Sequence, residues 1–419
     1  MSDGKTFNIL MYSHDTYGLG HIRRTMAIAG HLSRPDTNIL ILTGSPMAGR
    51  FKFPQYVDYV RIPGMIKKTN EDYFPLAIRI DPRQALEIRK SLILATASTF
   101  KPDLFIVDKE PLGLKKEVLP TLEWIRENLP LSRTVIGLRD VMDDSETIKK
   151  DWYDKGVYEA IESLYSEVWI YGNQNLYDPI KEYDIPRSIA EKCHFTGYIP
   201  RRVPERKRVV AMRRRLHASC RDPLVTVTTG GGGDGYPVLD AYLSMLESMI
   251  QRSVTPPFKS VIITGPFLSA EDWECLERRA RALGVRVFQF FTDMETLFAA
   301  SDLVVCMGGY NTVCEILSQK RPALVIPRET PRMEQSIRAG ALKQRHLLDS
   351  IPWGRIGPEI LENKILTMLG ASQTFVQAME TFELTGIREI CSRISLFRKL
   401  KNDHATDPVH DPQGVPAHL

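Results

Sequence analysis

The sequence has few cysteines, no paired cysteine motif and no long apolar run. Its 419 residues include six cysteines, none of them in a C-x-x-C pair of the kind that binds zinc or carries redox chemistry. Buried thiols in a reducing compartment explain these cysteines better than disulfides do. The apolar runs are shorter than a membrane span, and the N-terminus lacks the apolar core of a signal peptide. A cytoplasmic location is therefore predicted.

An excess of charge of one sign is also missing, because the net charge is only +4. This balance does not indicate a nucleic-acid partner. The cations are unevenly distributed, however, since residues 201–221 carry nine Lys or Arg against one Glu. A solvated helix face explains such a run, and the alternative is attraction to a phosphate-bearing substrate or an anionic membrane surface. No D-x-D triplet that could hold a divalent cation stands at the end of a strand, so no metal site is predicted.

Short apolar runs alternate with helical stretches along the chain, which is typical of parallel sheets covered by helices on both faces. The pattern runs once from "FNILMYS" to "KCHFTGYIP" and starts again at "PLVTVTTGGGGDG". We therefore predict an α/β protein with two Rossmann-like, doubly wound domains that face a common cleft. The predicted parts are an N-terminal domain (1–199), a C-terminal domain (200–370), a helical segment (371–400) and a disordered tail (401–419).

A glycine turn and a helix, "TYGLGHIRRTMAIAGHL", follow the first predicted strand, with Gly18, Gly20 and His21 at the turn. A dinucleotide-binding turn needs a third glycine, but Arg23 stands in its place. The next strand ends in Thr-Gly rather than in an acidic residue that could hold a ribose. A Rossmann dehydrogenase therefore fits poorly.

His21 is a candidate general base. The positive end of the helix dipole disfavours the imidazolium form, so the ring stays neutral and can accept a proton. A capping or packing histidine is the alternative. Asp15, Asp108, Arg139 and Asp140 lie at or near the ends of predicted strands and are possible neighbours of the ring, but spacing along the sequence does not rank them.

Two loops of the second half carry groups suited to phosphates and sugars. In "TTGGGGDG" the glycines Gly230–Gly233 allow a close backbone approach to an anion, although a plain flexible turn is the alternative. Tyr236 and Pro237 replace the Lys and Ser/Thr of a Walker A loop, which argues against ATP hydrolysis. In "IPRETPRMEQ", Glu334 and Gln335 open a helix and could read sugar hydroxyls.

A third loop, in "CMGGYNTVCEILSQ", carries a candidate ribose ligand. Gly308 and Gly309 end a strand, and the next helix is predicted to begin near Asn311 or Thr312, both of which are reasonable cap residues. Glu315 lies one turn into this helix, where its carboxylate could accept hydrogen bonds from two ribose hydroxyls. The alternative is a surface glutamate that simply suits the helix dipole.

These pieces, in this order, resemble the glycosyltransferases of family 28, a family that includes the N-acetylglucosaminyltransferases of lipid-linked muramoyl pentapeptide and the monogalactosyldiacylglycerol synthases. Residues 290–335 are similar to the donor-binding segment of that family over its full length. "FTGYIPRR" resembles the interdomain linker, and "GLGHIRRTMAIAGHL" resembles a reduced form of the N-terminal glycine loop that ends in histidine. The resemblance covers about two thirds of the chain.

The resemblance implies a GT-B fold and an inverting, metal-independent transfer from a nucleotide diphosphate sugar, commonly UDP-linked, with no cofactor besides this co-substrate. It implies that His21 is the base. The implied donor-binding residues are Arg201 or Arg202, Gly230, Gly231, Gly232, Gly233, the backbone at Phe291, Gly308, Gly309, Asn311, Thr312, Glu315, Glu334 and Gln335. Gly18, Gly20, Asp108 and Arg139 are predicted to lie on the acceptor side.

The expected acceptor is a carbohydrate or a lipid-linked molecule, with possible peripheral contact with an anionic membrane and no role for nucleic acid. The first loop has fewer glycines than the peptidoglycan enzyme of the family, and the basic, loop-rich region 61–75 differs from its acceptor side. Peptidoglycan synthesis is therefore not assumed. The alternatives are a nucleotide-sugar epimerase of the same fold and a non-catalytic nucleotide-sugar-binding subunit.

Overall fold

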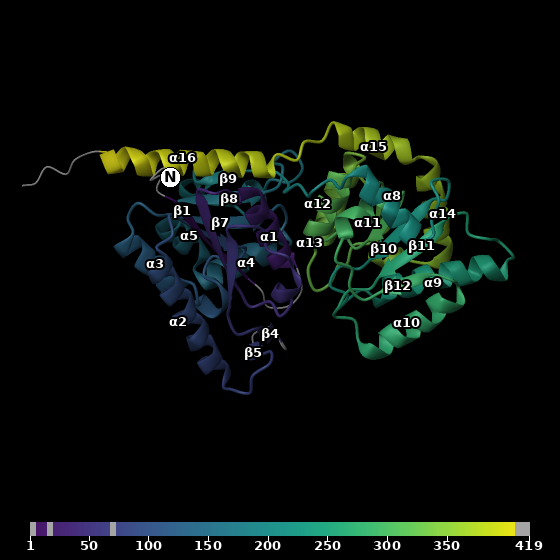
Figure 1. Cartoon of the computed structure of the whole chain (residues 1–419), viewed down its shortest axis with the longest axis horizontal. Helices are drawn as coiled ribbons and strands as arrows, with labels where there is room; N and C mark the ends of the chain where they lie inside the picture. Colours follow the sequence, from purple (N-terminus) through teal and green to yellow (C-terminus); the bar gives the residue numbers. More distant parts are fainter. Residues whose placement is uncertain (1–5, 15–19, 68–72, 407–419) are drawn as a thin grey trace, which may run out of the picture.

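The structure is a computed structural model that describes residues 6–14, 20–67 and 73–406, and it contains two separate parallel sheets (Figure 1). The first sheet has seven strands in the order β3-β2-β1-β6-β7-β8-β9. Its strands are β1 (Phe7–Ser13), β2 (Thr37–Thr43), β3 (Val57–Arg61), β6 (Leu104–Asp108), β7 (Arg133–Arg139), β8 (Glu167–Tyr171) and β9 (Cys193–Phe195). Every pairing in it is parallel, so each strand is reached through a crossover.

Helices cover both faces of this sheet because alternate side chains of its strands are apolar in both directions. On β1, Ile9 and Met11 pack on the side of α1, whereas Leu10 and Tyr12 pack on the side of α2 and α3. The connecting elements are α1 (Gly20–Leu32), η1 (Ala48–Arg50), the hairpin β4 (Met65–Lys67) and β5 (Tyr73–Pro75), α2 (Pro82–Phe100), η2 (Leu114–Lys116), α3 (Leu119–Asn128), α4 (Ser145–Lys155), α5 (Val157–Leu164), α6 (Pro179–Glu182) and α7 (Arg187–Ala190).

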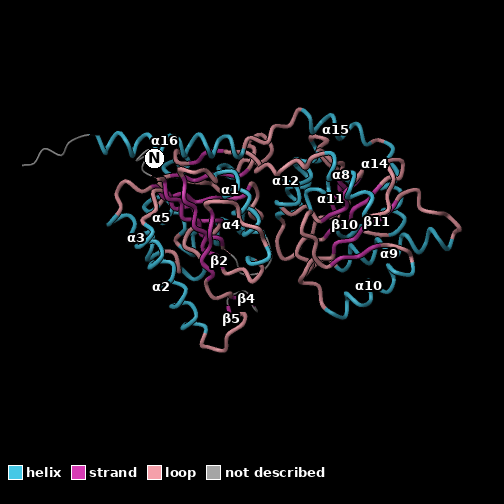
Figure 2. Tube along the Cα trace, viewed as in Figure 1, coloured by secondary structure: helices cyan, strands magenta, loops and turns pink. Residues whose placement is uncertain are grey.

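The second sheet has six parallel strands in the order β12-β11-β10-β13-β14-β15, again with helices between them (Figure 2). Its strands are β10 (Leu224–Thr228), β11 (Lys259–Ile263), β12 (Arg286–Phe288), β13 (Leu303–Cys306), β14 (Ala323–Val325) and β15 (Asp349–Ser350). The helices that precede, connect and follow them are α8 (Arg206–Arg215), α9 (Tyr236–Gln251), α10 (Ala270–Ala282), α11 (Met294–Ala300), α12 (Tyr310–Gln319), α13 (Glu334–Gln344), η3 (Trp353–Arg355), α14 (Pro358–Gly370), α15 (Ser372–Glu380) and α16 (Gly386–Thr406).

Both sheets reverse their strand order at the centre, between β1 and β6 in the first and between β10 and β13 in the second. In such doubly wound sheets the loops beyond the carboxyl ends of the two central strands form the crevice in which ligands bind. The prediction of two Rossmann-like α/β domains is confirmed. The first sheet ends at Phe195 and the second begins at Leu224, so the predicted division after residue 199 falls between them.

The last helix returns to the N-terminal domain, as Figure 1 shows for the yellow helix α16. The ring of its Phe397 stacks on the ring of Trp169 with 6.4 Å between the ring centroids, and Lys401 Nζ lies 2.5 Å from Asp103 Oδ1. Where the chain crosses back, Gly386 packs so closely on residues 197–198 that a Cβ would lie 2.6 Å from the carbonyl oxygen of Tyr198. The C-terminal end of the chain thus ties the two domains together.

Three expectations about the chain need correction. The predicted helical segment 371–400 is two helices with a break between them, because residues 381–385 form the crossing over the interdomain connection. Residues 401–406 of the predicted disordered tail continue α16, and residues 407–419 lie outside the described part. The region predicted to be loop-rich contains the hairpin of β4 and β5, and β3 was not predicted.

Candidate active site between the two domains

His21 lies at the start of α1, next to the end of β6, where the first sheet reverses its order. Its Nδ1 is hydrogen-bonded to Asp108 Oδ2. Arg24, one turn along α1, donates from Nη2 to both oxygens of the same carboxylate at 2.6 and 2.8 Å. Asp108 is therefore the carboxylate beside His21, whereas Asp140 lies at the domain interface and Asp15 lies outside the described residues.

The environment fixes the protonation of this pair. Burial lowers the pKa of His21 to about 4, against the opposing effect of the Asp108 carboxylate. Burial would raise the pKa of Asp108, but the Arg24 guanidinium and His21 hold it well below its usual range. At neutral pH the ring is neutral and the carboxylate is ionised, so Nδ1 carries the proton and Nε2 is left as an acceptor. That tautomer suits a general base.

The histidine does not act as a helix cap in the described part of the structure. Its Nδ1 donates to the side chain of Asp108, and no hydrogen bond from its ring to the backbone of α1 is present among the described residues. The geometry therefore favours the base over the capping interpretation of His21.

A second histidine, which the sequence analysis missed, lies against the first. The rings of His14 and His21 meet edge to face with 5.7 Å between centroids. His14 Nδ1 lies 3.2 Å from the hydroxyl of Tyr12, which donates to Glu117 Oε1 at 2.5 Å, and Arg89 binds both oxygens of Glu117. The sequence offered one signal for His14, because polar residues follow directly after the apolar strand "FNILMY". These buried polar side chains thus form a hydrogen-bonded chain beside His21.

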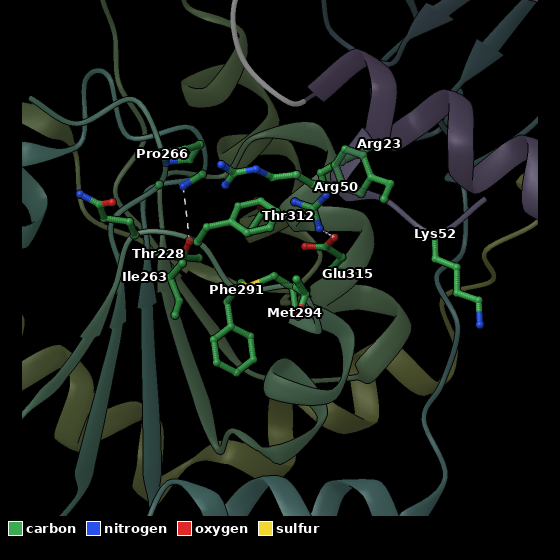
Figure 3. Close-up of a pocket in the computed structure, with 16 residues that line it drawn as sticks. Arg23, Arg50, Lys52, Thr228, Ile263, Pro266, Phe291, Met294, Thr312 and Glu315 are labelled. Atoms are coloured by element: carbon green, nitrogen blue, oxygen red, sulfur yellow. Dashed lines mark hydrogen bonds and ion pairs between the residues drawn. The ribbon is translucent and has the colours of Figure 1, made fainter. Parts of the chain in front are cut away.

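A pocket of about 360 Å³ lies where the two domains meet (Figure 3). Four residues predicted to bind the donor line it: Gly230, Phe291, Thr312 and Glu315. Gly230 and Phe291 come from the loops that follow β10 and β12, and Thr312 and Glu315 come from α12, the helix that follows β13. The pocket therefore lies at the switch point of the second sheet. The N-terminal domain contributes Arg23, Arg50, Phe51 and Lys52 to the lining of this pocket. The sequence analysis did not single out these four residues for this site.

Glu315 is buried in the first turns of α12 with one oxygen free. Its Oε1 is paired with Arg23, as the dashed line in Figure 3 marks, and its Oε2 has no hydrogen-bond partner among the described residues. A buried acceptor without a donor is costly, so this oxygen is ready to accept from a ligand hydroxyl. The helix begins at Tyr310 with Gly309 as its N-cap, so neither Asn311 nor Thr312 caps it.

Asn311 faces the domain interface rather than the pocket. Its Nδ2 donates to the carbonyl oxygen of Gly20 at 2.7 Å, and its Oδ1 accepts from Arg201 Nη2 at 2.8 Å. Arg201 also borders a smaller cavity beside Glu315. These two predicted donor ligands therefore join the interdomain connection and α12 to the start of α1, which carries His21.

The predicted glycine loops divide into ligand-facing and packing positions. Gly230, with φ +70°, lines the pocket, but Gly231–Gly233 do not. A Cβ at Gly232 would lie 2.3 Å from the carbonyl oxygen of Thr264, so this glycine allows two loops to pack. Gly308 likewise packs on the side chain of the β14 residue Val325, whereas Gly309 has open space around its Cβ position.

Glu334 and Gln335 open α13 as predicted, but they do not line the described pocket. Glu334 pairs with Arg139 of the N-terminal domain at 2.6 Å, and nearby cations including Arg139 lower its pKa to about 2 although burial acts in the opposite direction. Gln335 Oε1 accepts from the backbone N–H of Arg328 at 3.1 Å. A predicted sugar-binding residue and a predicted acceptor-side residue are thus joined across the interface.

A second buried ion pair joins the same two domains. Arg338 of α13 lies 2.7 Å from Asp140 Oδ1, and the hydroxyl of Tyr198 donates to Asp140 Oδ2 at 2.7 Å.

Of the predicted acceptor-side glycines, Gly20 begins α1 and Gly18 lies outside the described residues.

Several cations of the basic segment 201–221 interact with other residues of the chain. Arg208 pairs with Asp293 at 2.8 Å, Arg213 binds Asp302 at 3.0 Å and several backbone carbonyls, and Arg215 lies 5.3 Å from the ring of Phe291. Within the described ranges, no group of three His, Cys, Asp or Glu side chains is arranged to hold a metal ion, and none of the helices is long and apolar enough to cross a membrane.

Residues 227–394 match the glycosyltransferase family 28 C-terminal domain. The C-terminal domain of this chain is thus similar to the C-terminal domain of that family. The resemblance predicted from the sequence is therefore confirmed. A curated relative, the UDP-N-acetylglucosamine–N-acetylmuramyl-(pentapeptide) pyrophosphoryl-undecaprenol N-acetylglucosamine transferase of Alkaliphilus oremlandii, is 26% identical over 173 residues, which are 41% of this chain and 46% of the relative. The match thus spans about half the length of the curated relative.

Solved structures of this fold cover nearly the whole chain. MurG of Acinetobacter baumannii superposes with a TM-score of 0.59 at 14% identity, covering 94% of this chain and 99% of MurG. A UDP-N-acetylglucosamine 2-epimerase superposes with a TM-score of 0.60 at 11% identity, covering 98% of this chain and all of the epimerase (100%). These likenesses show the fold, which is GT-B as predicted and consists of two Rossmann-like domains.

Proposed function

We propose that the protein is an inverting, metal-independent glycosyltransferase that moves a sugar from a nucleotide diphosphate sugar to an acceptor hydroxyl. The observation that carries this proposal is the meeting of two half-sites at one interface. His21, oriented by Asp108, lies at the switch point of the N-terminal domain. Glu315 lines the pocket of the C-terminal domain and has a buried carboxylate oxygen without a partner among the described residues. Asn311 bonds the start of α1 to α12 and so connects the two.

In the proposed reaction, Nε2 of His21 takes the proton of the acceptor hydroxyl as its oxygen attacks the anomeric carbon. Attack occurs on the face opposite the diphosphate, so the configuration inverts. The ionised Asp108 stabilises the imidazolium that forms, and Arg24 keeps that carboxylate ionised and fixed. The proton later leaves to solvent.

The donor is proposed to be a UDP-sugar, as the printed activity of the curated relative suggests. Glu315 would hold the ribose and the backbone near Phe291 the base. Gly230 and the start of α12 would face the diphosphate, to which the first backbone N–H groups of α12 would donate. Glu334 and Gln335 would contact the sugar after the partners they have in this structure move aside. No metal or cofactor takes part in this scheme.

The binding of UDP tests the donor site. Glu315→Ala should weaken the binding of UDP by about tenfold to a hundredfold, because a hydrogen bond to a charged acceptor contributes about 1.5–3 kcal/mol. The affinity for inorganic pyrophosphate should stay unchanged. Calorimetry with Glu359→Ala, which removes a glutamate near the start of α14, is the matched control. Equal affinity of Glu315→Ala and wild type for UDP would show that the ribose assignment is wrong.

Incubation with UDP-sugars decides between transfer and its alternatives. A transferase releases UDP in proportion to acceptor, whereas an epimerase converts the sugar without any acceptor. Tight UDP-sugar binding with neither reaction over a panel of glycan and lipid-linked acceptors would favour the non-catalytic subunit. The likeness to the epimerase concerns the fold alone, whereas the family 28 match and the His21–Asp108 pair favour transfer.

For the acceptor and the location, we propose a lipid-linked or polysaccharide precursor met at the inner face of a membrane, with the protein docked peripherally from the cytoplasm. The acceptor in the printed name of the curated relative carries an undecaprenol chain. On α8, Lys207, Val210 and Arg214 are exposed and lie within two turns of one face, and Val203 just before the helix is 67% exposed. Cations of this kind attract an acidic leaflet.

Co-sedimentation with vesicles tests this docking. We expect binding to acidic vesicles at low salt and its loss at high salt, because each cation near the surface contributes about 1 kcal/mol and is screened by ions. Lys207→Glu with Arg214→Glu should abolish it. The same reversal at Lys181 and Arg187, which are exposed on α6 and α7, should not. If the wild-type protein does not bind acidic vesicles at low salt, a soluble acceptor is the better assignment.

A further inference from the structure

Two cations of the N-terminal domain line the nucleotide pocket without a carboxylate partner. Arg50 is the last residue of η1 and Lys52 lies in the loop after it, on either side of Phe51, and all three residues border the pocket. Within the ranges that the structure describes, neither cation forms an ion pair, whereas Arg23 at the same pocket is paired with Glu315. Unpaired cations over a shared cavity attract an anionic ligand.

The loop that carries these cations is held in place. The backbone N–H of Arg50 donates to the carbonyl of Met47 at 2.9 Å, and that of Phe51 donates to Ala48 at 3.1 Å. The side chain of Phe51 packs against the core that the two domains share. Phe53, two residues on, belongs to the same packing, so the cations are presented by a fixed support.

The opposite wall of the pocket also suits phosphate. Gly230 has a positive φ of 70° directly after β10, and Thr312 lies in the first turn of α12, where backbone N–H groups are not used within the helix. These groups belong to the C-terminal domain, and Arg50 and Lys52 line the same pocket from the N-terminal domain. In Figure 3 the side chain of Lys52 lies at the edge of the pocket, with its amine directed away from the other lining residues. A diphosphate between the walls would meet N–H dipoles from one domain and full charges from the other.

We propose that Arg50 and Lys52 bind the diphosphate of the donor, so that both domains hold the nucleotide sugar. This inference rests on the proposed function. As the acceptor oxygen forms its bond to the anomeric carbon, the bond from that carbon to the diphosphate oxygen breaks and its electron pair stays on the diphosphate. The two cations stabilise that charge, while the acceptor proton goes to His21.

The test compares UDP, inorganic pyrophosphate and uridine by calorimetry on the full chain. Arg50→Ala with Lys52→Ala should lower the affinity for UDP and pyrophosphate by about tenfold to a hundredfold and leave that for uridine unchanged. Arg50→Lys with Lys52→Arg keeps both charges and should stay within about threefold of wild type. Arg187→Ala, which removes a 93% exposed arginine of α7, is the matched control.

The outcomes separate this inference from the function on which it rests. Failure of the wild type to bind UDP overturns both. Normal UDP affinity in the double alanine variant overturns the diphosphate contact and leaves the proposed function standing. An equal loss of UDP and uridine affinity also overturns it, because the loop would then support the shape of the pocket rather than bind phosphate.

Discussion

Replacing His21 by Asn is expected to lower turnover by about 10²–10⁴ while the affinity for UDP stays nearly unchanged, because a positioned general base contributes this much and the nucleotide pocket is lined by other residues. His21→Ala should lower turnover equally. Turnover is measured with saturating donor, and UDP affinity is measured by calorimetry. His31→Asn, an exposed histidine in the last turn of the same helix, is the matched control and should remain active.

The pH profile gives this prediction a second readout. Because burial lowers the pKa of His21 to about 4, the ring is already a free base at pH 6, where a solvated histidine would be largely protonated. The rate constant kcat/KM should therefore be level from about pH 8 to pH 5 and fall as the pH approaches 4. Near-normal turnover in His21→Asn, with only a lower Tm in His21→Ala, would make the histidine structural. The base would then be sought among Asp15, Asp108 and Asp140.

The fold could be predicted from the sequence because its signals are local. Each central strand is a short apolar run that ends in a glycine or polar turn, as in "FNILMYS" and "PLVTVTTGGGGDG", and each following helix has its own apolar face. The edge strand β3 escaped prediction because only one of its five side chains, Val57, is buried and because it lies in a stretch rich in loops. The division of residues 371–406 between two domains depends on packing at Gly197 and Gly386, which no local pattern contains.

The site was predictable only in part, because its decisive contacts join residues distant in the sequence. Asp108 could not be ranked above Asp140, since only the strand order places β6 beside β1. Glu315 was found because its place one turn into a helix is a local feature. The bridging role of Asn311 and the cations Arg50 and Lys52 were missed because they involve the other domain, whose position the spacing does not give.

Asp108→Asn is expected to cost both stability and turnover. Asp108 lies between His21 and Arg24, and Arg24 is only 2% exposed, so the variant leaves a buried guanidinium without its counter-charge. Breaking a buried pair in this way costs about 3–5 kcal/mol. The Asn amide can also donate to Nδ1 of His21, which favours the tautomer with the proton on Nε2, and turnover should fall by about 10²–10⁴. Urea unfolding and steady-state kinetics measure the two effects.

A second variant separates catalysis from folding. Arg24 lies 5.5 Å from the ring of Tyr310 and 6.0 Å from that of Tyr171, so Met can take its place in the same aromatic surroundings. Arg24→Met combined with Asp108→Asn removes both buried charges and should regain much of the lost stability. Turnover should stay low, because no carboxylate holds the proton on Nδ1 and leaves Nε2 free to accept one. If turnover returns together with stability, Asp108 serves the fold alone, and the orientation of His21 must come from another neighbour such as His14.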